Sequence, residues 1–349
     1  MIYDTEDEIK PFYFARIEPN GQWNLRLDNS MLHCFTQCPR KFYYRYVLLQ
    51  NLKGMPGALS IGKWWSMVMD MFYTNMKTGS YPSRADFIEM AAIAWKELGM
   101  TEFEKQNPKA YAKFGGELGA AAMASEYWER IGHIDFTSIK IVESEAGFAL
   151  QLYEDNELAL TYCGKPDLVV FDKQSQFLAA MDHKTVDRID SQIQRKYKPH
   201  GQTAGYIWAT AYLAKGLGYD VPVDRCIMNI AARSMPSDNP KDGVKKPRFT
   251  RVYPTYSPEE IEEWKWSTVG KAKHLLKCLK MYAQACWGDG TFDDMESEFA
   301  MYDNSCHLYG GCDYRRVDSV APTNRQMVFK SDFNVVEPWI PVPEEEEEV

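Results

Sequence analysis

The sequence predicts a mixed α/β protein, in which a helical N-terminal region precedes a strand-rich centre and a C-terminal element that contains cysteines. The spacing of apolar residues supports this class, because it is helical up to about residue 130 and changes to short apolar runs between residues 141 and 182. The 349 residues, 45% of them hydrophobic and 14% aromatic, suffice for a large core. Disorder of most of the chain is excluded, and one elaborated domain or two small ones are expected.

Three helical regions are expected before the strands. The first begins with Ser30 as its N-cap and is interrupted at Pro39. The second region carries Trp64 and Trp65. Two adjacent residues cannot both face inward on one helix, so one of these rings is expected at a surface or groove. The second region covers about residues 60–78, and the third covers roughly residues 84–130 with interruptions near Asn107-Pro108 and Gly115-Gly116.

Short apolar runs separated by polar turns predict a series of antiparallel strands in the centre of the chain. Ser257 and Glu260 form a capping box that opens a long helix ending near Ala285. The expected strands are one over residues 141–142 and 148–152, then 158–163, 167–171 and 177–182, followed by a helix over about 199–215, a strand over 225–232 and a loop over 234–248.

These patterns divide the chain into five consecutive segments. They are an N-terminal arm (1–29), a helical region with the first cysteines (30–135), a strand-rich core (136–255), a long helix with a second cysteine element (256–320), and a Pro/Glu-rich tail without means of packing (321–349).

The charge balance restricts the partners that the chain can bind. It carries 40 basic and 49 acidic residues, a net charge of −9, and five of the acids form the run Glu344 to Glu348. An acidic chain does not bind polyanions generally, so contact with nucleic acid requires a local basic patch or a bridging metal. The sequence shows neither a signal peptide nor a run of 18 apolar residues, which predicts a soluble, cytoplasmic protein (in the host cytoplasm if viral) with no membrane contact.

The clearest chemical pattern lies on two consecutive predicted strands. A hairpin places Asp167 beside the end of the second strand, where Asp182 and Lys184 share a face because strand side chains alternate. The two carboxylates, with the main-chain carbonyl of His183, form an oxygen site suited to Mg²⁺. A lysine beside such a site can position or deprotonate a water molecule, and the metal can neutralise charge on a phosphate. This combination predicts hydrolysis of phosphodiester bonds.

Two flanking segments can complete this site. Glu143 and Glu145 lie on one face of the preceding strand and are candidates for a third metal-binding acid. Gln202 and Tyr206 lie four residues apart on the following helix, so both can point into the same cleft.

In this order of motifs, the chain resembles the RecB-like branch of the PD-(D/E)XK nucleases, which includes AddB-type exonucleases and the nuclease of CRISPR spacer acquisition. The resemblance implies a restriction-endonuclease-like mixed central sheet flanked by helices. It further implies a DNA nuclease dependent on Mg²⁺ or Mn²⁺, with Asp167 and Asp182 as metal ligands, Lys184 serving the attacking water, and Gln202 and Tyr206 completing the site. The motifs are residues 30–47 with Cys38-Pro39-Arg40-Lys41-Phe42-Tyr43-Tyr44, the strand with Glu143 and Glu145, Gly164-x-x-Asp167, Asp182-x-Lys184 and Gln202-x-x-x-Tyr206.

One departure from that family keeps other functions open. The family usually carries Gly-x-x-x-His on an early helix, and here Gly62 is followed by Ser66 in the place of the histidine. The main hypothesis is an exonuclease acting on single-stranded DNA or duplex ends in recombination, repair or phage DNA processing. The alternatives are a weak or inactive DNA-binding or assembly subunit with a protein partner, and a metal-stabilised interaction protein that uses its acidic tail.

The cysteines suggest a second metal site. Several members of the family hold a [4Fe-4S] cluster with one cysteine from the opening segment and three near the C-terminus. Cys38, Cys306 and Cys312 match three of these positions, and Asp318 stands in place of the last cysteine. Cys34, one helical turn before Cys38, or Asp318 can supply the fourth ligand. Zinc and unliganded thiols are the alternatives.

DNA contact requires basic and aromatic side chains near these elements. Each basic run alone is more often a solvated face, and the aromatic residues are more often part of the core. The basic candidates are Arg40, Lys41, Arg45, Arg195, Lys196, Lys198 and the loop from Lys241 to Arg251, and the candidates for stacking on bases are Tyr43, Tyr44, Trp64 and Trp65.

Overall fold

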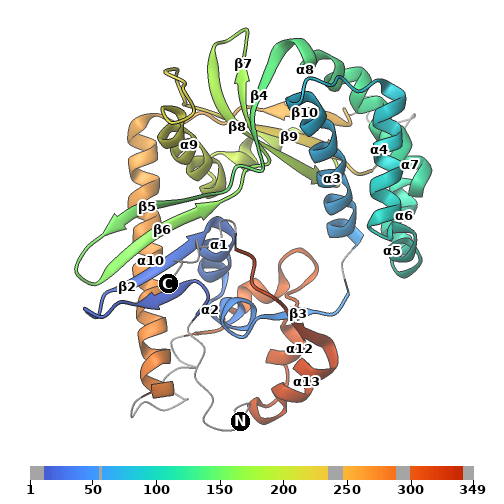
Figure 1. Ribbon diagram of the computed structural model, residues 1–349. Helices are drawn as coiled ribbons and strands as arrows, with labels where there is room; N and C mark the ends of the chain where they lie inside the picture. Colours follow the sequence, from blue (N-terminus) through green and yellow to red (C-terminus); the bar gives the residue numbers. More distant parts are fainter. Residues whose placement is uncertain (1–11, 55–56, 235–246, 288–298, 341–349) are drawn as a thin grey trace, which may run out of the picture. The chain divides into compact units, whose positions relative to one another are not determined.

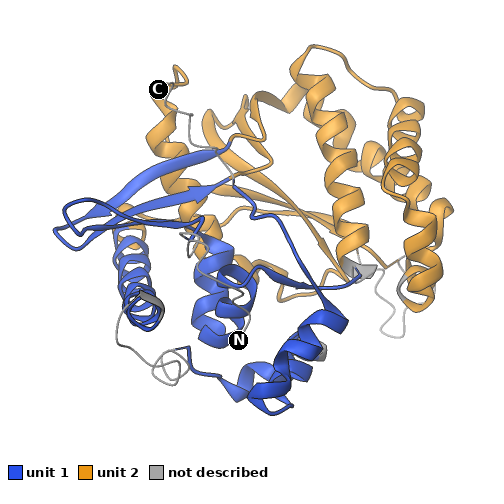
Figure 2. Ribbon diagram, turned by 60° about the horizontal axis from the view of Figure 1, so that its bottom comes forward, with its two compact units in different colours: residues 1–54, 147–164, 262–349 blue, residues 55–146, 165–261 orange. Residues whose placement is uncertain are grey.

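The computed structural model describes residues 12–54, 57–234, 247–287 and 299–340 (Figure 1). The chain forms two compact units built from non-contiguous stretches (Figure 2). Unit 1 contains Met1–Gly54, Gly147–Gly164 and Glu262–Val349, and unit 2 contains Met55–Ala146 and Lys165–Ile261. The units therefore cross the segment boundaries expected from the sequence. Within the described ranges, no helix combines the length and apolar character needed to cross a membrane.

Unit 2 is built on a five-stranded mixed sheet with the order β10-β9-β8-β7-β4. The pair β8–β9 is parallel and the other neighbours are antiparallel. This arrangement confirms the predicted mixed α/β class and is consistent with a restriction-endonuclease-like fold. The strands are β4 (Ile139–Ser144), β7 (Leu168–Asp172), β8 (Phe177–Val186), β9 (Cys226–Ala232) and β10 (Phe249–Val252).

The strand expected over residues 141–142 and 148–152 is two strands in different sheets, so that prediction was wrong. β4 ends at Ser144, and β5 (Phe148–Glu154) belongs to unit 1. Between them Glu145 adopts a positive φ of 50°, a conformation that interrupts an extended strand. The expected antiparallel series is therefore divided between two sheets.

The helix α3 (Gly57–Lys77) packs on one face of the unit 2 sheet and buries both tryptophans, contrary to expectation. The ring of Trp64 contacts Trp95 and Phe114 on outer helices, whereas Trp65 stacks with Phe249 of β10. The helix is thus covered on two sides, so adjacent residues can both be buried. The outer layer contains α4 (Arg84–Glu97), α5 (Met100–Gln106), α6 (Pro108–Phe114), α7 (Gly116–Tyr127), a π-helical turn (Trp128–Gly132) and α8 (His133–Ser138), with breaks at the two predicted places.

The opposite face of this sheet carries α9 (Gly201–Ala214), which follows the short 3₁₀ helix η3 (Ile193–Tyr197). Ala214 of α9 packs with Leu178 and Val169 on this face. Residues of β8 that alternate along the strand therefore face α3 or α9.

Unit 1 contains a four-stranded sheet with the order β1-β2-β6-β5. Asp28, rather than the predicted Ser30, caps the first helix, because its carboxylate accepts a hydrogen bond of 2.8 Å from the Met31 N–H. The chain breaks at Cys38 before Pro39, as predicted. The sheet consists of β1 (Ala15–Ile17), β2 (Trp23–Asp28), β6 (Leu158–Gly164) and β5. The strand β2 leads directly into α1 (Asn29–Gln37), α2 (Pro39–Phe42) and a π-helical segment (Tyr43–Val47).

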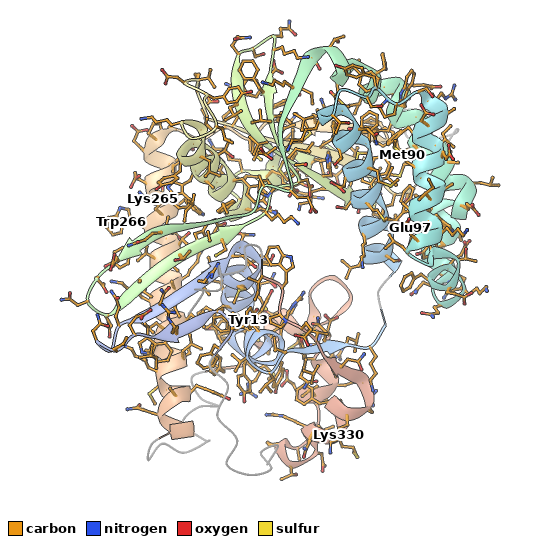
Figure 3. The ribbon with its side chains drawn as sticks, viewed as in Figure 1. Tyr13, Met90, Glu97, Lys265, Trp266 and Lys330 are labelled. Atoms are coloured by element: carbon orange, nitrogen blue, oxygen red, sulfur yellow. The ribbon has the colours of Figure 1, made fainter. Side chains whose placement is uncertain are left out.

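The long helix α10 (Pro258–Trp287) starts at the predicted capping box, in which the Ser257 N–H donates to Glu260 at 2.7 Å. Lys265 and Trp266 project from α10, and Trp266 is 68% exposed (Figure 3). The C-terminal part of unit 1 contains η4 (Asp303–Gly310), α12 (Arg315–Asp318), η5 (Pro322–Asn324), α13 (Arg325–Asp332) and β11 (Phe333–Val335), which pairs with β3 (Gln50–Leu52).

The stretch expected to be an unpacked tail is partly folded. Val328, Phe329 and Phe333 are buried in a small core with Tyr44. The prediction was therefore wrong for residues 322–335, because it weighed proline and glutamate content above these apolar side chains. The run Glu344 to Glu348 lies outside the described residues.

Candidate active site

The centre of the site lies on β8, where Asp182 and Lys184 occupy the same face. Asp182 is only 3% exposed, and the Lys184 Nζ lies 2.6 Å from its Oδ2 atom. Burial raises the pKa of Asp182 and the lysine charge opposes that rise. Burial lowers the pKa of Lys184, but the charge and hydrogen bond of Asp182, together with the charges of Asp167 and Tyr197, raise this pKa overall. The lysine side chain is 34% exposed, whereas that of Asp182 is 4% exposed.

Asp167 immediately precedes β7 and joins this pair. The register of β7 and β8 pairs Leu168 with Met181, so Asp167 and Asp182 are the next residues on neighbouring strands. The Oδ2 atom of Asp167 accepts a hydrogen bond of 2.6 Å from the His183 N–H. Burial raises the pKa of this carboxyl too, although the hydrogen bond and the charge of Lys184 lower it. The hairpin thus brings the two predicted acids and the lysine together.

The helix α9 contributes Gln202 and Tyr206 to the same face. Gln202 donates from Nε2 to Oδ1 of Asp182 at 3.4 Å and to the Tyr206 hydroxyl at 3.0 Å. Tyr206 in turn donates to the carbonyl of Lys165 at 3.1 Å. These contacts connect the helix to Asp182 and to the segment that precedes Asp167, so Gln202 and Tyr206 point to the same side, as the i, i+4 spacing predicted.

Glu143 and Glu145 do not act together, contrary to the expectation that they share a face. The side chain of Glu143 pairs with Lys77 at 2.7 Å, and that of Glu145 pairs with Lys165 at 2.6 Å. The register shift within β4 and the positive φ of Glu145 explain the divergence. Glu145 stays close to the site, because its N–H donates to the Asp167 carbonyl and its charge raises the pKa of Asp167.

Two residues near the site were missed by sequence reasoning. The charge of Asp70 on α3 raises the pKa of Asp167. Asp70 lies one turn after Ser66, so helical spacing was the available signal. Tyr197 is 7% exposed, and its pKa responds to the charges of Lys184 and Asp182. No sequence pattern pointed to Tyr197.

The donor chemistry of the site suits a hard divalent cation. Among the described residues, no three His, Cys, Asp or Glu side chains are already arranged to hold a metal ion. The carboxylates of Asp167 and Asp182 nevertheless adjoin on one face, and in the structure the ammonium of Lys184 compensates the buried charge of Asp182. Such oxygen donors fit Mg²⁺ or Mn²⁺.

The basic candidates in unit 2 differ in availability. Arg195 and Lys196 are exposed on η3. Lys198 is held by Glu260 at 2.8 Å and by the Thr255 carbonyl. In the predicted basic loop, Arg248 is buried beside Glu126 and Arg251 pairs with Asp135 at 2.6 Å, so neither is free to bind phosphate. Lys241, Lys245 and Lys246 lie outside the described residues.

The four cysteines considered for a cluster lie in unit 1 and are electrostatically coupled. Burial raises the pKa of Cys34 to about 12, with the charges of Cys38 and Cys312 adding to this rise. The pKa of Cys306 is raised by burial and then by the charges of Cys312, Asp318 and Cys38. The Tyr302 N–H donates to the Cys38 sulfur at 3.5 Å. In the described chain these thiols do not form a ready metal-binding group.

Asp318 is engaged by other partners. The Tyr44 hydroxyl donates to its Oδ1 at 3.0 Å, and Arg40 lies 4.0 Å from the same atom. Arg40 also donates to the Phe299 carbonyl at 2.8 Å and its side chain is only 11% exposed. Arg40 and Tyr44 therefore serve packing of the two ends of unit 1, which corrects their expected roles in DNA contact.

The remaining residues of the opening segment are more accessible. Lys41 is half-buried, and its charge lowers the pKa of Cys34 and Cys312. Arg45 is exposed and lies over the ring of Tyr46, with 5.6 Å between its Cζ atom and the ring centroid. Tyr43 is half-buried against Phe299 and Tyr282. Together with the buried Trp64 and Trp65, these contacts leave few of the predicted aromatic side chains available for stacking on bases.

Comparison with known proteins identifies the family of the chain. No curated protein was found to match the chain. A family model described as the PD-(D/E)XK nuclease superfamily matches residues 27–317, which is most of the chain. The match includes Asp167, Asp182 and Lys184. The chain therefore belongs to the PD-(D/E)XK nuclease superfamily.

Proposed function

We propose that this protein is a metal-dependent deoxyribonuclease of the RecB-like branch. The convergence of Asp167, Asp182 and Lys184 at one end of the β7–β8 hairpin is the observation that carries the proposal. Asp167 and Asp182, with the main-chain carbonyl of His183, would hold Mg²⁺ or Mn²⁺. When bound, the ion would neutralise phosphate charge and lower the pKa of a water molecule.

The side chains of the site have separate tasks in this proposal. Lys184 orients the attacking water and stabilises the phosphate, because its side chain is partly exposed and its ammonium lies 2.6 Å from the Asp182 carboxylate. Gln202 holds the Asp182 carboxylate and the Tyr206 hydroxyl in place. In the reaction, the water oxygen loses a proton to solvent and forms a bond to phosphorus, the bond from phosphorus to the sugar oxygen breaks, and the leaving oxygen receives a proton from solvent.

The substrate class is DNA, either single-stranded or with a duplex end. Arg195 and Lys196 support this assignment, because they are exposed on the same short helix as Tyr197, whose pKa responds to the catalytic lysine. A phosphate chain gripped there would pass next to Lys184. A nuclease with this substrate would act as an exonuclease. It would serve recombination, repair or phage DNA processing, together with a protein partner.

We also propose a [4Fe-4S] cluster in unit 1, held by Cys34, Cys38, Cys306 and Cys312. The mutual effects of these thiols on their pKa values support their proximity, and the contacts of Asp318 with Tyr44 and Arg40 favour Cys34 as the fourth ligand. Anaerobically purified protein is expected to be brown and to contain iron and sulfide. Colourless, folded protein without iron would refute the cluster, and stoichiometric zinc would identify the alternative.

Digestion of end-labelled single-stranded and duplex DNA with Mg²⁺ or Mn²⁺ tests the nuclease. Lys184→Ala and Asp182→Ala are expected to abolish cleavage. Lys173→Ala is the matched control, because Lys173 is exposed at the turn of the same hairpin. Equal cleavage by both site variants and the wild type would refute the assigned site.

A second function, a DNA-binding subunit without turnover, is favoured by Ser66 in the place of the family's histidine. Ser66 is exposed on α3, and a Cβ at Gly62 one turn earlier would lie 3.2 Å from Thr185 at the end of β8. Retention of DNA without cleavage under both metals would support this alternative. The interaction-protein hypothesis requires that the protein neither binds nor cleaves DNA.

A further inference from the structure

A buried polar network lies on the α3 side of the sheet, directly behind the proposed site. His183 is the member of this network that belongs to β8. The imidazole of His183 stacks on the Tyr73 ring, with 5.2 Å between the centroids and 13° between the planes. Asp135, Tyr73, Tyr127 and Asn229 are at most 2% exposed. Its members are Tyr73, Tyr127, Asp135, His183, Asn229 and Arg251, all within unit 2.

The direction of each hydrogen bond at Asn229 follows from Arg251. A guanidinium can only donate, so the Asn229 atom 3.3 Å from the Arg251 Nε must be the amide oxygen. The amide NH₂ then donates to the Tyr127 hydroxyl at 2.7 Å and to Nδ1 of His183 at 2.9 Å. Because Nδ1 accepts, the neutral ring must carry its proton on Nε2.

The remaining bonds are directed in the same way by Asp135. Its carboxylate accepts from Arg251 at 2.8 and 2.6 Å and from the Tyr73 hydroxyl at 2.6 Å. The Tyr73 hydroxyl therefore accepts from Tyr127, at 2.7 Å. Every polar group between Asp135 and His183 thus has a single orientation, and such networks rigidify the core that contains them.

The tautomer of His183 is imposed at a cost. The Nε2 atom is buried and finds no hydrogen-bond partner among the described residues. A buried N–H without an acceptor costs free energy. The ring nevertheless keeps its proton there, because Asn229 offers only a donor to Nδ1.

The backbone of the same residue reaches the opposite side of the sheet. The His183 N–H donates to Asp167 at 2.6 Å, and its neighbours Asp182 and Lys184 form the ion pair of the site. Fixing the imidazole against Tyr73 and Asn229 therefore restrains the peptide that holds Asp167. Ligand carboxylates depend on such outer partners for their orientation.

We propose that Asn229 is a positioning residue, which acts through the imidazole of His183 to hold the Asp167 carboxylate in the orientation needed to bind a divalent cation. Arg251, itself fixed by Asp135, sets the direction of the Asn229 amide. The proposal rests on the proposed function only for the use of that cation.

Asn229→Asp tests the proposal, because it replaces the donor to His183 by an acceptor with little change in volume. The measurements are Mn²⁺ affinity by electron paramagnetic resonance and the His183 tautomer by ¹H–¹⁵N spectra of the full chain. Mn²⁺ affinity is expected to fall about ten-fold, and His183 is expected to move its proton to Nδ1. An added negative charge alone would strengthen cation binding, so the expected sign distinguishes positioning from simple electrostatics.

Tyr127→Phe is the second variant, and it decides the question if Asn229→Asp does not fold. It removes one hydroxyl of the network and keeps the ring, so its fall in Mn²⁺ affinity is expected to be smaller than that of Asn229→Asp. Tyr111→Phe is the control, since it removes a buried hydroxyl that binds Ser60 at 2.7 Å, outside the network. Its Mn²⁺ affinity should match the wild type.

The proposal would be overturned by wild-type Mn²⁺ affinity in folded Asn229→Asp, by an equal loss in Tyr111→Phe, or by an Nδ1-protonated His183 in the wild type. Wild-type protein that binds Mn²⁺ but does not cleave DNA would refute the proposed nuclease and leave this inference standing. If the wild type binds no Mn²⁺, the role in cation binding is refuted as well.

Discussion

The ammonium nitrogen of Lys184 lies 2.6 Å from Oδ2 of Asp182, and the two side chains differ sharply in exposure, 34% for the lysine and 4% for the aspartate. A buried carboxylate requires a compensating charge, and the lysine supplies it in the protein alone. The lysine side chain is partly exposed, whereas that of the acid is enclosed. A cation that takes over the compensation of Asp182 would free the ammonium to act on substrate, which gives the pair a role beyond stability.

The burial of Asp167 predicts that its ionised carboxyl lowers the stability of the metal-free protein, although the proposed site uses that carboxyl to bind a cation. Its pKa is raised in the folded protein, so the native state binds more protons than the unfolded chain, and stability is lost as pH rises through the raised pKa. Asp167→Asn removes this loss and keeps an oxygen for the His183 N–H. The metal-free variant is expected to melt roughly 2 °C higher at neutral pH, a difference of about 1 kcal/mol.

The melting temperature should be followed by calorimetry across pH, with and without Mn²⁺. The advantage of Asp167→Asn is expected to vanish at acid pH, where the wild-type carboxyl is protonated. Added Mn²⁺ should stabilise the wild type more than the variant. A variant that melts below the metal-free wild type at neutral pH would contradict the assignment of Asp167 as a destabilising buried charge.

The exposed cations of η3 predict a change in the salt dependence of DNA binding. Each phosphate contact that is lost lowers the slope of log affinity against log salt by about one. Arg195→Ala combined with Lys196→Ala should therefore reduce the slope by about two and weaken binding equally for all sequences. Lys198→Ala is the control, because Glu260 already holds that lysine. Equal slopes for all three proteins, measured by fluorescence anisotropy, would count against η3 as the DNA contact.

The cysteine element predicts which side chains retain iron. Asp318 already binds Tyr44 and Arg40, so Asp318→Asn should keep the iron content and colour of the anaerobic protein. Cys34→Ser should lower the iron content severely, because it removes one of four thiolates. Cys163→Ser is the matched control, since Cys163 is a buried thiol outside this element. Iron loss in Asp318→Asn with retention in Cys34→Ser would reverse the assignment of the fourth ligand.

Local chemistry could be read from the sequence, whereas contacts between distant segments could not. The capping box of Ser257 and Glu260 and the meeting of Asp167 with Asp182 depend on residues three and fifteen positions apart, joined by one turn or hairpin. Arg251 was expected to contact DNA, but it pairs with Asp135, 116 residues away. Only the folded unit brings Asp135 of α8 next to Arg251 of β10.

The sequence also did not show that the helix α3 is covered on two sides. Trp64 and Trp65 were expected to diverge because a surface helix has one apolar side. Nothing in the local sequence shows that outer helices cover α3, so the burial of both rings required the tertiary structure. Sequence reasoning also missed β10, because its partner β9 ends at Ala232, well before β10 begins at Phe249.

Two helical glycines predict opposite effects of the same substitution. A Cβ at Gly119 in α7 would lie 1.9 Å from the Phe114 carbonyl oxygen, because the turn at Gly115 folds that carbonyl over the helix. Gly119→Ala should therefore destabilise unit 2 by about 3 kcal/mol. Gly270 in α10 is exposed with nothing within 4 Å of its Cβ position, so Gly270→Ala should stabilise the protein by about 1 kcal/mol through helix propensity. Thermal unfolding of both variants measures the difference, and a neutral Gly119→Ala would show that the α6–α7 turn relaxes freely.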